Sequence, residues 1–339
     1  TINENIINIT STTTLYGARL YYGNYYTFEK NKITVQNTTT IYPLYCYNYY
    51  DANYTYGNSV YLNNNEIKST STTTAYLYGH QNYSKNCEFN NNKIDIDNAS
   101  GTFYGYISYY YQNNTKTNGN TIKLKGTSGT KYIYINYYYG FNGYECNDND
   151  IDVSLTTGSM NFYMGYYSDQ NKSPVYINNN KIKMSSNGSI TCYIGYYDYT
   201  NQTTSEIKGN KVSLVTTSGN ALNYMAQYQN ASTIVADNDI FVQATSTAYG
   251  MYAYGQSGSS LPHVFKNNKI VAISSSAAYG LYAPYNNYVE AYNNSICVRG
   301  GNSTVYGLYF AYCNGGANVY NNTVHSEGTS TNYTAYLYQ

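Results

Sequence analysis

A five-residue phrase, Asn-x-Ile-x-Val or a close variant, returns twelve times along the 339-residue chain. Its first residues are Asn5, Asn31, Asn65, Asn92, Asn120, Asn149, Asn180, Asn210, Asn238, Asn268, Asn294 and Asn322. Successive asparagines are 26 to 34 residues apart. A repeat of roughly 20–50 residues that runs the length of a chain is typical of a solenoid or a propeller. We therefore expect a single domain over residues 1–339, built as a stack of similar coils.

Each repeat reads as three short strands. In the coil that begins at Asn268, these strands are 268–272, 279–283 and 289–292. They are β-branched or aromatic, alternate with period two and are separated by Asn, Ser and Gly. No segment has apolar residues at helical spacing for three turns. The pattern predicts an all-β solenoid of about twelve coils of ~29 residues, with parallel pairing between neighbouring coils.

Two positions after each Asn, every residue is Ile or Val. The position four residues after the Asn is also mainly apolar, as is the position three residues before it. Such columns are expected to face inward and to pack coil on coil, so Ile151 and Ile182 should be neighbours in the core.

Charged residues occupy the outward columns and alternate in sign from coil to coil. One position after the Asn lie Lys32, Glu66, Lys93, Asp150, Lys181, Lys211, Asp239 and Lys269. Three positions after it lie Lys68, Asp95, Lys123, Asp152 and Lys183. Opposite charges on adjacent strands support each other, so alternation at this lag predicts one exposed, stacked sheet. Lys181 beside Lys211 is the exception.

Asn is a poor strand residue, yet it opens every first strand. Asn tolerates the left-handed backbone region and bonds neighbouring backbone groups. We expect these asparagines at the corners of the coils, where each amide can bond its equivalent in the next coil.

Tyr279-Gly280-Leu281-Tyr282, followed by Asn293-Asn294-Ser295-Ile296, resembles the repeat of right-handed parallel β-helices, the pectate-lyase-like solenoids. The resemblance covers essentially the whole chain and implies a right-handed parallel β-helix. That family includes polysaccharide lyases and epimerases, phage tailspikes and passenger domains of bacterial surface adhesins, so it says little about activity. A propeller is the alternative, but twelve blades of ~29 residues would be too many and too short.

The charge balance argues against nucleic acid as a partner. The chain has 18 basic and 18 acidic residues, and Arg19 and Arg299 are the only arginines. A nucleic-acid-binding surface needs clustered basic residues.

No run of ~18 apolar residues is present, so no membrane span is predicted in this chain. The chain starts at Thr1, inside a repeat, which is expected of a processed product or of a fragment of a longer rod.

The best carboxylate cluster is Asp148, Asp150 and Asp152. Alternate strand residues share a face, and carboxylate oxygens suit Ca²⁺, so these three residues are a weak metal candidate. Asp150 and Asp152 also fit the charge columns beside Lys181 and Lys183, which is the structural alternative. The histidines, His80, His263 and His325, occupy unrelated coil positions. We expect no enzyme, no catalytic residue and no cofactor.

Tyrosine is the most unusual part of the composition, with 52 residues and no tryptophan. Many tyrosines take outward positions of the second strand: Tyr45, Tyr76, Tyr78, Tyr106, Tyr134, Tyr193, Tyr252, Tyr282, Tyr309 and Tyr336. Tyr is a good strand former, which is one explanation. The functional explanation is a ribbon that contacts glycan or another copy of the chain, centred on Tyr106, Tyr134, Tyr193, Tyr252, Tyr282 and Tyr309.

Six cysteines, Cys46, Cys87, Cys146, Cys192, Cys297 and Cys313, lack the CxxC spacing of a zinc site. We expect free, buried thiols that act as small hydrophobic residues.

These patterns together favour a non-enzymatic, secreted, rod-like structural or adhesive protein, extracellular or on a cell surface. Neither end shows a cap, and open strand edges recruit further strands. We therefore expect either more coils of the same chain or end-to-end self-association into a fibre. The alternative is a β-helix that binds or cleaves an extended polysaccharide. The source organism, the ligand and the glycosylation state stay open at this point.

Overall fold

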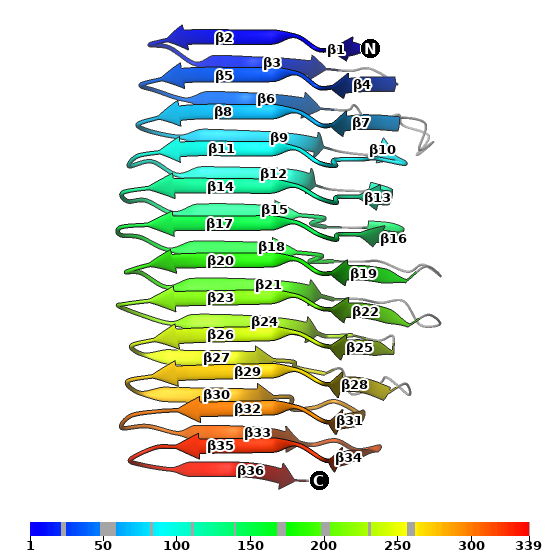
Figure 1. Cartoon of the computed structure of the whole chain (residues 1–339), viewed down its shortest axis with the longest axis vertical. Helices are drawn as coiled ribbons and strands as arrows, with labels where there is room; N and C mark the ends of the chain where they lie inside the picture. Colours follow the sequence, from blue (N-terminus) through cyan, green and yellow to red (C-terminus); the bar gives the residue numbers. More distant parts are fainter. Residues whose placement is uncertain are drawn as a thin grey trace.

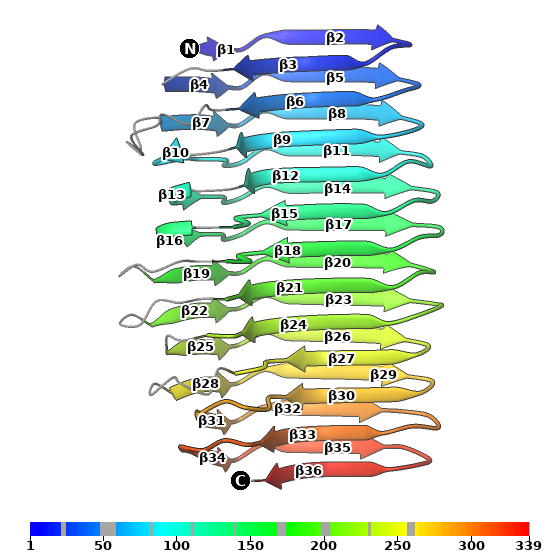
Figure 2. The same cartoon turned by 180° about the vertical axis from the view of Figure 1, so that it is seen from behind.

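The computed structural model describes residues 1–21, 25–47, 59–81, 84–109, 112–138, 140–167, 174–197, 204–229, 232–255 and 262–338. These residues form a right-handed parallel β-helix, in which three strands make each coil and the coils stack into a rod (Figures 1 and 2). All pairs between neighbouring strands are parallel. The predicted fold class is confirmed.

The first long sheet, named here the charged sheet, has twelve strands. They are β2 (Ile6–Ser11), β5 (Lys32–Asn37), β8 (Glu66–Ser71), β11 (Lys93–Asn98), β14 (Thr121–Gly126), β17 (Asp150–Leu155), β20 (Lys181–Ser186), β23 (Lys211–Thr216), β26 (Asp239–Ala244), β29 (Lys269–Ser274), β32 (Ser295–Arg299) and β35 (Thr323–Glu327).

The second long sheet, named here the tyrosine sheet, also has twelve strands. They are β3 (Leu15–Tyr21), β6 (Ile41–Tyr47), β9 (Ala75–Gln81), β12 (Phe103–Tyr109), β15 (Lys131–Ile135), β18 (Met160–Met164), β21 (Ile190–Tyr196), β24 (Ala221–Gln227), β27 (Thr247–Tyr252), β30 (Ala277–Tyr282), β33 (Val305–Ala311) and β36 (Asn332–Tyr338).

The third face consists of shorter strands in sheets of three and nine. The three are β1 (Ile2–Asn3), β4 (Tyr25–Glu29) and β7 (Ser59–Asn63). The nine are β10 (Ser84–Lys85), β13 (Gln112–Lys116), β16 (Gly140–Glu145), β19 (Val175–Asn178), β22 (Ser205–Lys208), β25 (Thr233–Ala236), β28 (Pro262–Lys266), β31 (Tyr288–Tyr292) and β34 (Gly316–Tyr320).

The core is made of the predicted inward columns. Ile151 pairs with Ile182 in the register of β17 and β20, and both side chains are buried. The Ile/Val column is buried from Ile33 to Ile296, and only its end members, Ile7 and Val324, are partly exposed. Burial of β-branched side chains in unbroken rows is the main favourable term that holds the coils together.

The twelve repeat asparagines form one continuous amide ladder. Between Asn149 and Asn180, both the backbone N–H and the side-chain amide of Asn149 donate to Asn180 Oδ1, at 3.0 and 2.9 Å. The same pair of bonds joins every consecutive pair from Asn5 to Asn322. Each of the ten internal asparagines is buried. The predicted ladder is confirmed.

The left-handed backbone conformation, however, is adopted by the residue before each ladder asparagine. That residue has φ between +54° and +67° in all twelve coils. It is Asn in six of them, as at Asn64 and Asn179, and Gly119 and Gly209 provide it in two more. Asn, Asp and Gly adopt this conformation at the lowest cost. The common Asn-Asn doublet thus combines a turn residue with a ladder residue, which corrects the prediction that one Asn does both.

The charge columns are in the predicted register. Asp152 lies between Lys123 and Lys183, and Lys183 Nζ is 3.9 Å from its carboxylate. Lys181 Nζ lies 3.2 Å from Asp150 Oδ2. Lys181 also pairs with Lys211 in the sheet, which is the exception that the sequence shows. All of these groups are exposed, so each pair contributes only tenths of a kcal/mol and favours the register more than the stability.

Two buried basic residues were not predicted. Lys131 opens β15 with its side chain in the core, where its ammonium donates to the carbonyl and side-chain oxygens of Asn98 and to Gly101 O. Burial lowers the pKa of Lys131 to about 8, against the attraction of Asp97. The His263 side chain, on β28, is also buried, and burial lowers its pKa to about 4. The side chain of His80 lies outside the described residues.

Replacing a ladder asparagine in mid-stack should destabilise the rod. Asn180→Ala removes Oδ1, which accepts two hydrogen bonds from Asn149. It also removes the side-chain amide that donates to Cys146 O. Each buried polar group left without a partner costs ~1–3 kcal/mol, so we expect a loss of about 3 kcal/mol or more in urea unfolding. Asn5→Ala, at the exposed end of the ladder, is the matched control and should cost under ~1 kcal/mol. Equal losses for both variants would contradict the structural role of the ladder.

Charge reversal tests the register of the charged sheet. Asp152→Lys places three lysines in a row between β14 and β20. We expect a loss of about 0.5–1 kcal/mol at low salt, which added salt reduces by screening. Asp152→Asn, which removes the charge without reversing it, should lose about half as much. A loss that is independent of salt would rule out coil-to-coil repulsion as its cause.

Candidate functional site: the tyrosine sheet

Eleven tyrosines form one unbroken column on the outer surface of the tyrosine sheet. They are Tyr45, Tyr78, Tyr106, Tyr134, Tyr163, Tyr193, Tyr224, Tyr252, Tyr282, Tyr309 and Tyr336. Arg19 precedes Tyr45 in register, and its guanidinium lies 4.7 Å from the Tyr21 ring centroid and 5.1 Å from that of Tyr16. All eleven side chains are partly exposed. We call this set the tyrosine column.

All six residues that the sequence singled out as the contact ribbon lie in this column. Tyr163 and Tyr224 belong to it as well but were not predicted. Tyr76, which the sequence placed in the ribbon, pairs with Tyr104 in a flanking column instead. Tyr163 and Tyr224 lie 14 residues after Asn149 and Asn210, the same offset that Tyr106 has from Asn92, so the sequence carried a signal for both. The strand register shifts only beyond them, at a bulge between β24 and β27, where Leu222 and Tyr224 face Tyr249 and Tyr252.

Eight of the ten consecutive ring pairs in the column stack along the rod, whereas Tyr45 with Tyr78 and Tyr224 with Tyr252 pack edge to face at 80°. Tyr106 and Tyr134 have centroids 5.0 Å apart and planes within 6°. Tyr163 and Tyr193 are 4.8 Å apart at 6°, and Tyr309 and Tyr336 are 5.0 Å apart at 5°. Strands are spaced at ~4.8 Å, whereas carbon atoms in contact lie ~3.5–4.0 Å apart. The rings therefore tilt against the rod axis and pack in the offset-stacked arrangement that aromatic pairs prefer.

Spacing in the sequence decides how a ring packs against its neighbour within a coil. Tyrosines two residues apart have nearly parallel planes: 4° for Tyr76 with Tyr78, 1° for Tyr104 with Tyr106 and 2° for Tyr132 with Tyr134. Tyrosines three residues apart pack edge to face in most coils. The interplanar angles are 86° for Tyr163 with Tyr166, 84° for Tyr279 with Tyr282, 76° for Tyr306 with Tyr309 and 75° for Tyr333 with Tyr336. Both arrangements cover the ring faces with other rings.

A further column lies at the corner where the tyrosine sheet ends. Tyr197, Tyr228, Tyr254, Tyr285 and Tyr312 follow each other, with centroids 4.6 to 5.1 Å apart. Tyr197, Tyr228, Tyr285 and Tyr312 have φ between +50° and +59°, a region that bulky residues rarely adopt. The ring stack and the coil-to-coil backbone bonds, such as Tyr285 N–H to Ala311 O at 2.8 Å, hold this conformation.

This packing raises the pKa of the phenols. Burial is the main cause, and neighbouring phenols add to it because one phenolate disfavours the next; together they raise the pKa of Tyr106 and of Tyr252 to about 12. The pKa values of Tyr78, Tyr193 and Tyr282 are raised for the same reasons. The surface is therefore a neutral array of ring edges and hydroxyl groups at physiological pH.

The predicted metal candidate does not form a metal-binding group. Among the described residues, no three His, Cys, Asp or Glu side chains lie together in a way that could hold a metal ion. Asp150 and Asp152 face Lys181 and Lys183, as the charge columns predict. Asp148 has φ +59° and is the turn residue before Asn149. Asp150 and Asp152 are thus explained by their ion pairs with lysines, and Asp148 is explained by its place in the turn.

Comparison of the chain with family models, with curated proteins and with solved structures finds no match. The likeness to pectate-lyase-like solenoids therefore remains a resemblance of motif and fold. In the part of the chain that the structure describes, no helix is long and apolar enough to cross a membrane.

The tyrosines should make the fold sensitive to alkali. A group whose pKa is raised by folding binds its proton more tightly in the folded state, so its contribution to stability is complete below the unfolded pKa of ~10 and is lost as the pH rises toward the folded value. We expect phenolate absorbance to appear in a steep step together with loss of β-sheet circular dichroism, above pH ~10. The urea-unfolded chain should titrate gradually near pH ~10. Gradual titration of the folded rod near pH 10 would contradict the packed tyrosine surface.

Proposed function

We propose that this chain is a non-enzymatic, rod-like structural or adhesive protein that works outside the cell or on its surface, and that the tyrosine sheet is its contact surface. The observation that carries the proposal is the tyrosine column, in which one partly exposed aromatic side chain recurs in eleven consecutive coils. A surface that repeats at every coil offers the same contact many times. This suits an extended or repetitive partner better than a single small substrate.

Tyrosine is suited to such a contact. Its ring has few rotatable bonds, so it offers a large amphipathic area at low entropic cost. Here the stacking limits ring motion further. Tyr163, for example, is 4.8 Å from Tyr193 and 5.0 Å from Tyr134 by ring centroids. Much of the ordering that binding normally requires is thus complete before a partner arrives.

The partner that this geometry favours is another copy of the chain. Each ring turns its faces to neighbouring rings, so a partner meets ring edges and hydroxyls. A second tyrosine sheet presents the same groups, and hydroxyls both donate and accept hydrogen bonds. End-to-end association stays part of the proposal. Among the described residues, β2 and β35 are the end strands of the charged sheet and β3 and β36 are those of the tyrosine sheet, and parallel pairing is the contact that neighbouring coils make.

Binding of an extended glycan is the second candidate. Phenol hydroxyls recur at one-strand intervals along the column, so a polysaccharide that lies along the rod would meet a regular series of hydrogen-bonding groups. Stacking of sugars on aromatic faces is not favoured, because the faces are covered by other rings. Binding would therefore depend on hydrogen bonds at the ring edges.

Three substitutions in the middle of the column test the proposal. The triple variant Tyr163→Thr, Tyr193→Thr, Tyr224→Thr keeps strand propensity but removes three stacked rings. Tyr176→Thr, Tyr288→Thr and Tyr292→Thr on the third face make a matched control. In sedimentation velocity over a range of concentrations, we expect the wild type and the control to self-associate, and the column variant to need at least ~10-fold higher concentration, about 1.4 kcal/mol.

The outcome also separates the two candidates. A wild-type chain that stays monomeric but binds polysaccharide, with binding lost in the column variant alone, would favour the glycan function. Adhesion and self-association that are the same in all three proteins would refute a contact role for the tyrosine sheet. Circular dichroism of each variant verifies that the β-helix is intact.

A further inference from the structure

Cys297 differs from the other cysteines. The structure describes all six as free thiols, and five are buried while Cys297 is partly exposed. It lies on the outward face of β32, three positions after Asn294. In the register of β32 and β35, Cys297 is directly opposite His325, one strand spacing of ~4.8 Å away. A thiol and an imidazole thus share one face of the charged sheet.

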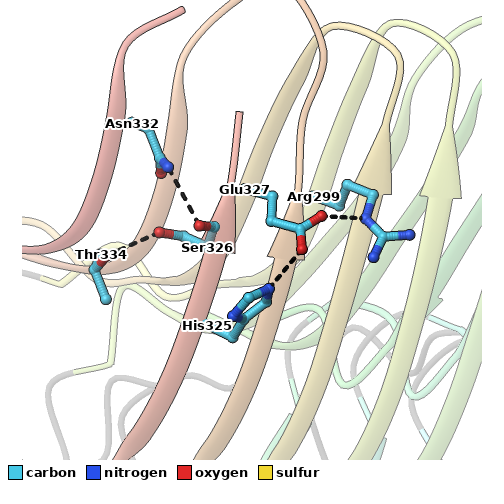
Figure 3. A network of polar contacts seen from close by, with 6 residues as sticks. All are labelled: Arg299, His325, Ser326, Glu327, Asn332 and Thr334. Atoms are coloured by element: carbon cyan, nitrogen blue, oxygen red, sulfur yellow. Dashed lines mark hydrogen bonds and ion pairs between the residues drawn. The ribbon is translucent and has the colours of Figure 1, made fainter. Parts of the chain in front are cut away.

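His325 is held by a charged network. Its Nε2 lies 2.8 Å from Glu327 Oε1, and Arg299 Nε donates to Glu327 Oε2 at 2.7 Å. Figure 3 shows the carboxylate of Glu327 between the imidazole and the guanidinium. The hydrogen bond from His325 and then that from Arg299 hold the pKa of Glu327 below its usual range. Glu327 is therefore a carboxylate at neutral pH, and it fixes the imidazole by its Nε2 atom.

In this arrangement Nδ1, the other imidazole nitrogen, is the one that can accept a proton from the thiol. With Nε2–H donating to Glu327, Nδ1 of the neutral ring carries the lone pair. Nδ1 is the ring nitrogen nearer the backbone, and the cysteine sulfur is only one bond beyond Cβ. Because Cys297 and His325 stand opposite each other on one face of adjacent strands, rotation of the cysteine side chain about its Cα–Cβ bond can bring Sγ toward Nδ1. Glu327 would stabilise the imidazolium that forms when Nδ1 takes a proton.

The other groups around the thiol do not compete for this role. On β29, the strand on the opposite side, Val271 pairs with Cys297 and Ile273 pairs with Arg299. The titratable groups that face outward from the described strands β29, β32 and β35 are Lys269, Arg299, His325 and Glu327. Glu327 is the one carboxylate among them, and both His325 and Arg299 contact it.

We propose that Cys297 is a nucleophilic thiol that undergoes exchange with disulfides, with His325 as the proton acceptor and with Glu327 and Arg299 as positioning residues. Sγ of Cys297 attacks one sulfur of the incoming disulfide. A new S–S bond forms as the old one breaks, and the thiol proton passes through His325 Nδ1 to the departing thiolate. The products are a mixed disulfide on Cys297 and one free thiol, with no net oxidation.

This site goes beyond the proposed adhesive function, because it gives the rod one point for covalent attachment on a sheet other than the tyrosine sheet. The partner chemistry is a small-molecule disulfide or an exposed protein disulfide. The remaining cysteines serve as internal controls. Burial raises the pKa of Cys313 to about 11 and also raises the pKa values of Cys46, Cys146 and Cys192. Those thiols stay protonated and out of reach.

The test uses the folded chain and an aromatic disulfide that releases a coloured thiolate. We expect one equivalent to react per chain, and peptide mass spectrometry should place the modification on Cys297. Cys297→Ser should abolish the reaction. His325→Gln and Glu327→Gln should slow it by at least ~10-fold, whereas Thr323→Ala, on the same strand but opposite Ser295, should leave the rate unchanged.

The pH dependence distinguishes a proton acceptor from a merely structural neighbour. The wild-type rate should level off at a lower pH than the rate of His325→Gln, because only the wild type has a proton acceptor opposite the thiol. Equal rates and equal pH profiles for the wild type and His325→Gln would overturn the proposal. So would modification of several cysteines at once, which would mean that the reaction follows unfolding.

Discussion

The buried amide ladder is the interaction on which the rest of the structure depends. Each of the ten internal ladder asparagines accepts two hydrogen bonds from the preceding coil and donates from its own amide to the following one, as at Asn180. A buried amide that loses these partners is costly, so a coil cannot slip by a residue without leaving donors and acceptors unpaired. The ladder therefore fixes the parallel register of the charged sheet, and through it the position of every other residue in the coil.

Once the register is fixed, residues at equal or nearly equal distances from the asparagine become neighbours along the rod. This produces the continuous isoleucine column in the core, the charge columns outside it and the tyrosine column on the adjacent sheet. The same rule places Cys297 opposite His325. Local chemistry in this protein is thus set by residues about one repeat apart in sequence, and hardly at all by residues adjacent in the chain.

The two long sheets use this register differently. In the charged sheet, oppositely charged side chains such as Lys181 and Asp150 form exposed ion pairs, which contribute little to stability. In the tyrosine sheet, the side chains cover one another's ring faces and leave hydroxyls and edges for a partner. The second arrangement presents a neutral and preorganised surface, which is why we propose it as the contact surface. The Cys297 site lies on the charged sheet, so covalent attachment and tyrosine contact would use different faces of the rod.

The sequence alone determined the period, the three strands per coil, the inward columns and the signs of the charge columns. These features follow from hydrophobic alternation and from a motif that recurs at every coil. It also placed Tyr106 and Tyr282 in one outward column, because both lie 14 residues after a repeat asparagine. Tertiary structure decided what depends on register shifts and turn geometry. A bulge shifts the pairing of β27 with β24, so that Tyr224 meets Tyr252 edge to face, and the left-handed turn is formed by the residue before each ladder asparagine. It also decided that Lys131 turns inward to carbonyl groups of the preceding coil, since its burial depends on hydrogen bonds that no linear pattern reveals.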